Sequence, residues 1–254
     1  MSHMQLYHEL AEYYFAIEAN HRDIHNDISL IRSLLKGRIE PRLLDIGCGS
    51  GEHLDKLSKY GITCTGIDSS RAMLDIARKR YPDAATFIYD DLRTFDFYNE
   101  FDMIMSLFGS FNYMVNETDV DKALWNTWRA MKPDGMGLFE VWNSLPVERI
   151  KEKEISPVSK TRYDGVLIER ERGFHRLPAA GRTVVEVDYR YTIYGQGGSR
   201  TITDQHVMRT FTTDEMNRYL SDNGFRIREI YSSFIKEEYQ DFSNRMVILF
   251  DKSV

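Results

Sequence analysis

The stretch Asp45-Ile46-Gly47-Cys48-Gly49-Ser50-Gly51 decides the fold. It follows a short apolar run at 42–46, and Leu54 and Leu57 after it have the spacing of one helix face. Glycines at such a junction let the backbone approach a ligand closely, because a Cβ atom there would clash. The stretch therefore predicts a strand, a ligand-binding turn and a helix, which is the repeating unit of an α/β domain.

A dinucleotide-binding fingerprint, GxGxxG, is the rival interpretation of this turn. Its third glycine would fall at Glu52, and acidic side chains at Glu52 and Asp45 both oppose the binding of a pyrophosphate. An acidic residue ahead of GxGxG instead suits a ligand that has an ammonium group and no phosphate. A tight turn without a ligand is the third interpretation.

Strand and helix patterns alternate beyond the turn. Apolar runs at 62–67, 85–89, 101–107 and 136–142 are separated by helical spacings, and two further strand patterns follow residue 224. This alternation predicts a doubly wound, mostly parallel seven-stranded sheet with helices on both faces. We expect residues 1–40 to form an N-terminal helical lid, and residues 41–145 and 211–254 to form the core.

The alternation stops after Trp142. Residues 146–210 are expected to form an insertion. Three strand-like runs lie from about Val166 to Phe211, and in the clearest one, 185–193, apolar and polar side chains alternate. This predicts an inserted antiparallel sheet with one buried face, which needs a partner surface. The insertion is therefore expected either to roof the active site or to form a homodimer interface. The run Glu169-Arg170-Glu171-Arg172 is interpreted as a solvated face.

Composition excludes several classes of function. The 254 residues carry a formal net charge of −6, which argues against a nucleic-acid or membrane-surface partner and leaves a small molecule. Cys48 and Cys64 form no CxxC and have no His cluster beside them, so we expect neither a disulfide nor a metal. A reducing cytoplasm is the simplest setting, since there is no signal-peptide pattern and no apolar run of roughly 18 residues.

Acidic residues also end the next two strands of the predicted sheet. Asp68 ends the second strand and Asp91 follows the third. Because ligands bind outside the carboxyl ends of such strands, Asp45, Asp68 and Asp91 are expected on one side of one site. A carboxylate at Asp68 can accept hydrogen bonds from two ribose hydroxyls, and one at Asp91 can accept from an adenine amino group.

The glycine turn, Gly66-Ile67-Asp68, Asp90-Asp91-Leu92 and Lys132-Pro133-Asp134-Gly135 resemble the motifs of class I S-adenosylmethionine-dependent methyltransferases. The resemblance covers residues 40–142 and 211–251. It implies a Rossmann-like fold and S-adenosyl-L-methionine as cofactor, with the three turn glycines at the methionine moiety, Asp68 at the ribose and Asp91 at the adenine. The cofactor-binding residues expected in this way are Asp45, Gly47, Gly49, Gly51, Asp68, Ser69, Met73, Asp91, Leu92 and Leu107.

A narrower resemblance is to small-molecule methyltransferases, among them the N,N-dimethyltransferases of nucleotide-linked deoxysugars. It rests on four stretches: Tyr7-His8-Glu9-Leu10-Ala11 with Tyr14, residues 106–113, Phe139-Glu140-Val141-Trp142, and Arg209-Thr210-Phe211-Thr212. The chain departs from those enzymes at Tyr113, where they carry a histidine. That departure leaves cofactor binding untouched and puts the sugar-amine substrate in doubt.

Methyl transfer is an in-line displacement, so the protein mainly holds the reacting atoms in line and excludes water. The expected catalytic residues are Tyr14, Tyr113 and His206. We expect the two tyrosines to face each other across the methyl group and to orient the nucleophile, because a tyrosine with a pKa of about 10 is a poor base. Packing is the alternative for Tyr14, and a structural histidine for His206. The expected substrate-binding residues are Phe108, Asn112 and Trp142.

The sequence thus predicts a metal-independent S-adenosylmethionine-dependent methyltransferase that acts on an amine, less readily a hydroxyl, of a small polar metabolite. The alternative from a different class is a protein that binds S-adenosylmethionine without transferring the methyl group and acts as a sensor or subunit.

Overall fold

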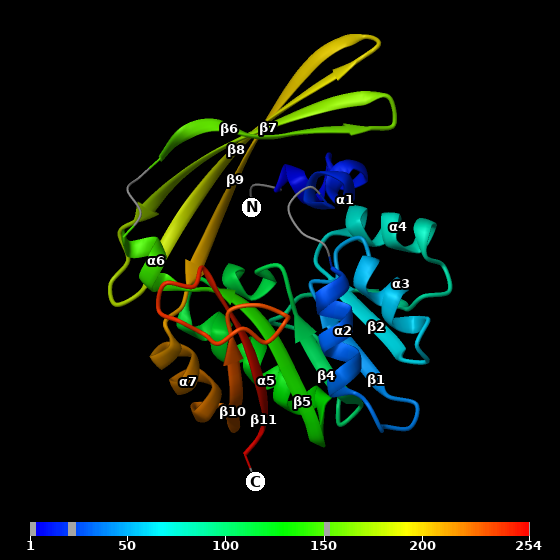
Figure 1. Ribbon diagram of the computed structural model, residues 1–254, viewed down its shortest axis with the longest axis vertical. Helices are drawn as coiled ribbons and strands as arrows, with labels where there is room; N and C mark the ends of the chain where they lie inside the picture. Colours follow the sequence, from blue (N-terminus) through cyan, green and yellow to red (C-terminus); the bar gives the residue numbers. More distant parts are fainter. Residues whose placement is uncertain (1–3, 20–23, 150–152, 254) are drawn as a thin grey trace.

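A seven-stranded sheet forms the centre of the molecule in the computed structural model, which describes residues 4–19, 24–149 and 153–253 (Figure 1). The strand order is β10-β11-β5-β4-β1-β2-β3, and β11 alone runs antiparallel to its neighbours. The predicted doubly wound, mostly parallel sheet is therefore confirmed. Its strands are β1 (Arg42–Ile46), β2 (Thr63–Asp68), β3 (Thr86–Tyr89), β4 (Phe101–Ser106), β5 (Met131–Trp142), β10 (Phe225–Tyr231) and β11 (Arg245–Lys252).

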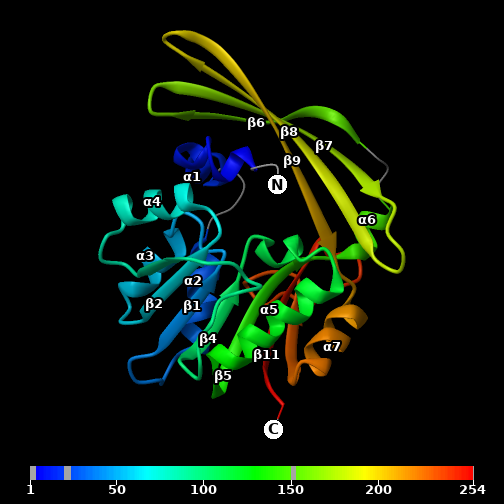
Figure 2. The ribbon, with the colours of Figure 1, turned by 180° about the vertical axis from the view of Figure 1, so that it is seen from behind.

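Helices bury an apolar stripe against each face of this sheet. On one face, α2 (His25–Leu34), α3 (Glu52–Ser58) and α4 (Arg71–Arg80) contribute Ile31, Leu57 and Leu74 to one apolar cluster. On the other, α5 (Glu117–Ala130) and α7 (Thr213–Asp222) contribute Leu124 and Leu220 to a second (Figure 2). None of the described helices is long and apolar enough to cross a membrane.

The insertion after β5 is a separate antiparallel sheet of order β6-β7-β8-β9, entered through α6 (Ser144–Arg149). The predicted inserted sheet is confirmed, with one strand more than expected. The missed strand is β6, at the sheet edge, which contains Pro157 and two irregularities of register and therefore has no two-residue alternation. The strands are β6 (Lys153–Tyr163), β7 (Val166–Leu177), β8 (Thr183–Gly195) and β9 (Gly198–Thr210).

The apolar face of the insertion is covered by the chain's own N-terminal segment. Leu6 of η1 (Gln5–Tyr7) and Ile17 of α1 (Ala11–Ala19) pack in one cluster with Val185 and Tyr191 of β8. Figures 1 and 2 show α1 between the two sheets. By contrast, α2 packs on the core sheet, so only the first part of the expected 1–40 lid lies beneath the insertion.

Arg170 corrects the interpretation of 169–172 as a solvated face. Its side chain is 6% exposed because the alternation of β7 points it toward the N-terminal segment. There its Nη1 donates to Glu18 of α1 at 3.1 Å, and its guanidinium lies 4.7 Å from the centre of the Tyr189 ring. The ion pair fastens α1 to the inserted sheet.

Candidate functional site

A cavity of about 630 Å³ lies between the N-terminal segment and the carboxyl edge of the core sheet. That volume is in the range of small-molecule sites. Among the described residues, none of β6–β9 lines it, so the insertion covers the cavity only indirectly, by holding η1 and α1 over it. Twelve expected site residues do line it: Tyr14, Asp45, Gly47, Gly49, Asp68, Ser69, Met73, Asp91, Leu92, Leu107, Phe108 and Tyr113.

The glycine turn forms a cradle that side chains would fill. Gly47 has φ +81°, and a Cβ atom there would lie 2.4 Å from Ser110 Oγ. A Cβ atom on Gly49, which has φ +54°, would lie 3.2 Å from Met73 Cε. Gly51 does not line the cavity; its φ of +85° begins α3, and a Cβ atom there would meet Phe87. The first two glycines therefore serve ligand approach, and the third serves helix packing.

Asp45 is a buried carboxylate that faces the cavity without a donor. It is 4% exposed, and no hydrogen bond to it comes from the part of the chain that the structure describes. Burial raises its pKa to about 7; the nearby His53 opposes this rise and the charge of Asp68 adds to it. A buried acceptor without a protein partner calls for a cationic donor from a ligand.

Asp68 lies beside the cradle and positions it. Its Oδ2 accepts from the Gly49 N–H and its Oδ1 from the Ser70 N–H, both at 2.8 Å. Burial raises the pKa of Asp68 to about 6 even though both backbone bonds lower it. Each oxygen keeps a lone pair for a further donor, such as a hydroxyl of a ligand in the cavity.

Asp91 is held by an arginine at the cavity wall. Arg93 donates from Nε and Nη2 to the two carboxylate oxygens at 2.6 and 2.7 Å. Burial works against the charge of Asp91, but the hydrogen bonds from Arg93 lower its pKa. A ligand amino group at this end of the cavity would therefore meet an ionised carboxylate that already has a cationic partner.

Phe108, two residues after the end of β4, has a positive φ of +54°, which is unusual for a bulky residue. Its N–H donates to Glu140 Oε2 at 2.9 Å, and Glu140 is fixed in turn by Arg245 at 2.8 Å. These contacts hold the Phe108 ring on the cavity wall. Strain of this kind concentrates at functional sites.

Four tyrosines line the same cavity: the expected Tyr14 and Tyr113, and also Tyr7 and Tyr81. Tyr7 lies between the two expected ones, with ring centres 5.8 Å from Tyr14 and 6.2 Å from Tyr113. Its hydroxyl lies 3.0 Å from that of Tyr113. Tyr7 was not among the expected site residues, although its seven-residue spacing from Tyr14 could have suggested a shared direction.

Three expected residues lie behind the wall. Asn112 is fully buried: its amide donates to the Arg209 carbonyl at 2.6 Å and accepts from the Trp142 N–H at 3.3 Å. It thereby ties η2 (Ser110–Tyr113) to β5 and β9. Trp142 packs against the apolar cluster of the insertion, and His206 is 2% exposed. These positions supply support, not direct contact with a ligand in the cavity.

His206 nevertheless reaches the cavity through Tyr113. Its Nδ1 lies 2.5 Å from the Tyr113 hydroxyl, and its Nε2 lies 2.9 Å from Asp204 Oδ2. Asp204 also accepts from the Leu6 N–H at 2.7 Å. Asp204 was not predicted, because it occupies one position of a long strand and carries no local motif.

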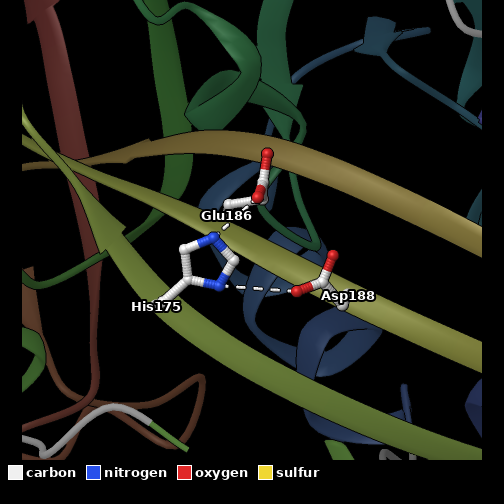
Figure 3. A group of neighbouring side chains, drawn as sticks. All are labelled: His175, Glu186 and Asp188. Carbon is white, nitrogen blue, oxygen red and sulfur yellow. Dashed lines mark ion pairs between the residues drawn. The ribbon is translucent and has the colours of Figure 1, made fainter. Parts of the chain in front are cut away.

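The described residues contain one group of three side chains with the spacing of metal ligands, on the far face of the insertion (Figure 3). His175 Nε2 pairs with Glu186 at 2.6 Å, and its Nδ1 pairs with Asp188 at 3.4 Å. Each carboxylate thus faces a different ring nitrogen of His175. The group links β7 to β8 away from the cavity.

Comparisons with known proteins agree with this geometry. A model of the family described as a methyltransferase domain matches residues 43–135. The chain is 31% identical over 222 residues to a dTDP-4-amino-2,3,4,6-tetradeoxy-D-glucose N,N-dimethyltransferase of Saccharopolyspora spinosa, with 85% of each covered. It is 28% identical over 208 residues to a dTDP-3-amino-3,4,6-trideoxy-alpha-D-glucopyranose N,N-dimethyltransferase of Streptomyces venezuelae, covering 81% of this chain and 85% of that one.

A solved structure shares the fold across nearly the whole chain. The S-adenosylmethionine-bound amino pentose methyltransferase CalS10 of Micromonospora echinaspora matches with a TM-score of 0.76 at 22% identity. The match covers 95% of this chain and 97% of that one.

Proposed function

Because the chain belongs to the class I S-adenosylmethionine-dependent methyltransferases, we propose that it methylates an amine of a small polar metabolite. S-adenosylmethionine is its cofactor. The observation that carries the proposal is the cavity itself: a glycine cradle with unpartnered carboxylate lone pairs, and a wall that also contains Tyr7, Tyr14 and Tyr113.

The residues at the cradle fit this cofactor. Asp45 offers a buried acceptor to the ammonium group, and the remaining lone pairs of Asp68 suit the ribose hydroxyls. Asp91 would accept from the adenine amino group while Arg93 keeps it ionised. Ser69, Met73, Leu92 and Leu107 complete the wall. Negative charge around the cradle also favours a sulfonium over a neutral sulfur.

When bound, the cofactor supplies an electrophilic methyl group. The chain then has to place the acceptor nitrogen in line with it and keep water away. Phe108, Tyr7, Tyr14 and Tyr113 are among the residues that line the cavity, and the Tyr14 ring lies 3.8 Å from the position of a Cβ atom on Gly49. We assign Tyr14 to orienting the acceptor, and the insertion to holding η1 and α1 in place.

An amine is favoured over a hydroxyl by the chemistry of the wall and by the relatives. Hydroxyl oxygens and aromatic rings accept N–H donors and stabilise an ammonium. Two relatives are named as N,N-dimethyltransferases of amino sugars. In this chain the His206 imidazole lies directly behind the Tyr113 hydroxyl, with Nδ1 2.5 Å from it.

Calorimetry and turnover together test the proposal. S-adenosylmethionine and S-adenosylhomocysteine should bind, and NAD should not. Turnover should be assayed by release of S-adenosylhomocysteine with dTDP-4-amino-2,3,4,6-tetradeoxy-D-glucose, free amino sugars and amino alcohols, each beside its hydroxyl counterpart. Methylation of the amines alone supports the proposal. Methylation of the hydroxyl compounds alone overturns the choice of nitrogen, and cofactor binding without any turnover would make the chain a sensor or subunit.

A further inference from the structure

The buried row Asp204, His206 and Tyr113 connects the inserted sheet to the cavity, and its hydrogen bonds can have only one direction when the imidazole is neutral. An ionised carboxylate only accepts, so His206 Nε2 must carry the proton that it shares with Asp204. Nδ1 then carries no proton and has a free lone pair, so the Tyr113 hydroxyl must donate its proton to Nδ1. The Tyr113 oxygen then accepts from the Tyr7 hydroxyl, which lies 3.0 Å away, and keeps one lone pair for a donor in the cavity.

The carboxylate behind the histidine is kept ionised although it is 7% exposed. Burial opposes the charge of Asp204, but the hydrogen bond from His206 and those from the N–H groups of Leu6 and Gln5 hold its pKa below the usual value. Its Oδ1 accepts from the Gln205 N–H at 2.9 Å. A buried carboxylate satisfied in this way fixes the tautomer of a histidine and stabilises the imidazolium that forms when the histidine takes a proton.

On the premise of the proposed function, we propose that Asp204, His206 and Tyr113 form a proton relay that removes a proton from the acceptor nitrogen. The nitrogen gives its proton to the Tyr113 oxygen while the Tyr113 hydroxyl proton moves to His206 Nδ1. Tyr113 ends as a neutral phenol, and His206 becomes an imidazolium beside Asp204. In this relay Tyr113 is the catalytic residue, and His206 and Asp204 act through it.

The surroundings of His206 agree with a concerted transfer. The titratable groups that face it are Asp204 on its own strand, Tyr189 of β8, Tyr7 of η1 and Tyr113 of η2, and Asp204 is the carboxylate among them. Burial raises the pKa of Tyr113 well above its usual value, so a standing phenolate is disfavoured. The proton must therefore leave Tyr113 as another arrives.

This relay changes what is expected of the two tyrosines. Tyr14 has no such partner among the residues that the structure describes, so it can only orient the acceptor. Tyr113, with an imidazole behind it, can also carry the proton away, which matters for an amine that arrives protonated or is methylated twice.

The first test reads the tautomer and needs no acceptor. Nitrogen-15 NMR of histidine-labelled protein at pH 8 should show the proton of His206 on Nε2, and Asp204→Asn should shift it toward Nδ1. His206→Gln identifies the resonance, and His175→Gln, the same change on the far face of the same sheet, is the control. A proton on Nδ1 in the unsubstituted protein overturns the relay, because Nδ1 could not then accept from Tyr113.

The second test is single-turnover methylation with saturating S-adenosylmethionine, using the best amine of the panel. At pH 7 we expect Tyr113→Phe, His206→Gln and Asp204→Asn to be slower by about 10² or more, and His175→Gln to be unchanged. The deficit should shrink as the pH rises past the pKa of the amine, since the amine then arrives deprotonated. A structural lesion would instead slow the reaction equally at every pH, and that result overturns the relay.

Failure of the relay and failure of the proposed function are distinguishable. If the unsubstituted protein methylates the amine but the three variants match it at every pH, the relay is wrong and the function stands. If only a hydroxyl acceptor is methylated, the choice of nitrogen is wrong, and the same pH profiles measured on that acceptor decide the relay. If the cofactor binds and nothing is methylated, both are wrong.

Discussion

Replacing Asp68 with asparagine should weaken cofactor binding about tenfold to 150-fold. The change keeps the size of the side chain but turns one acceptor oxygen into a donor. In the unsubstituted protein both oxygens accept a backbone N–H at 2.8 Å, so the variant must break the hydrogen bond from Gly49 or the one from Ser70. It also offers fewer acceptor lone pairs to the ribose hydroxyls. A hydrogen bond to a charged acceptor contributes roughly 1.5–3 kcal/mol, which gives that range of dissociation constants.

The pH dependence sharpens this prediction. Because the pKa of Asp68 in the cofactor-free protein is raised to about 6, the carboxyl is largely protonated at pH 5. Only the ionised form can accept from both hydroxyls, so protonation of Asp68 alone should raise the Kd about tenfold between pH 8 and pH 5. Asp68→Asn should lose this part of the pH dependence and keep the part that comes from Asp45.

Calorimetric titration with S-adenosylmethionine at pH 5 and pH 8 is the measurement. The matched control is Asp75→Asn, the same change on the exposed side of α4, where the side chain is 73% exposed and pairs with Arg78. Thermal unfolding shows whether each variant is folded. An unchanged Kd in a folded Asp68→Asn protein would remove Asp68 from the cofactor site and refute the reasoning.

Three further predictions follow from the same cavity. Burial raises the pKa of Asp45 from 3.8 to about 7, so the folded, cofactor-free protein loses stability as the pH rises from about 4 to 7. Asp45→Asn should therefore stabilise it against urea at pH 8 by an amount on the order of 4 kcal/mol while weakening cofactor binding; lower stability would contradict the assignment. Gly49→Ala should mainly weaken cofactor binding, because Gly49 lines the cavity, whereas Gly51→Ala should mainly lower the Tm, because a Cβ atom there meets Phe87. Equal effects of the two substitutions would argue against separate roles. Tyr14→Phe should slow single-turnover methylation only a few-fold, the cost of one neutral hydrogen bond, and a hundredfold loss would make it a base.

What the sequence predicted well was local in the chain. The glycine turn and Asp68 lie within 24 residues of each other, and strand-end acids of a parallel sheet necessarily share an edge. The two-residue alternation of 185–193 likewise predicted β8 and the face that it buries. In each case the positions of the residues along the chain determine which side of the sheet, or which edge, they occupy.

What the sequence did not reveal was brought together by distant contacts. Tyr113 and His206 are 93 residues apart, and the hydrogen bond between Leu6 and Asp204 spans 198. No local spacing distinguishes Asp204 from the other acids of the insertion. Arg170 was taken for a surface residue for the same reason, because the Glu18 that pairs with it lies 152 residues earlier.

The contacts that hold the N-terminal segment against the insertion, Leu6 to Asp204 and Glu18 to Arg170, also set the order in which parts of the fold can form. During synthesis at roughly 5–20 residues per second, the cradle residues 45–68 can meet within seconds of one another. Leu6 must wait for Asp204, and Glu18 for Arg170, separations of 198 and 152 residues. The N-terminal segment can therefore take its place only after the cradle residues have been made, and the acceptor side of the cavity closes after the cofactor side can already exist.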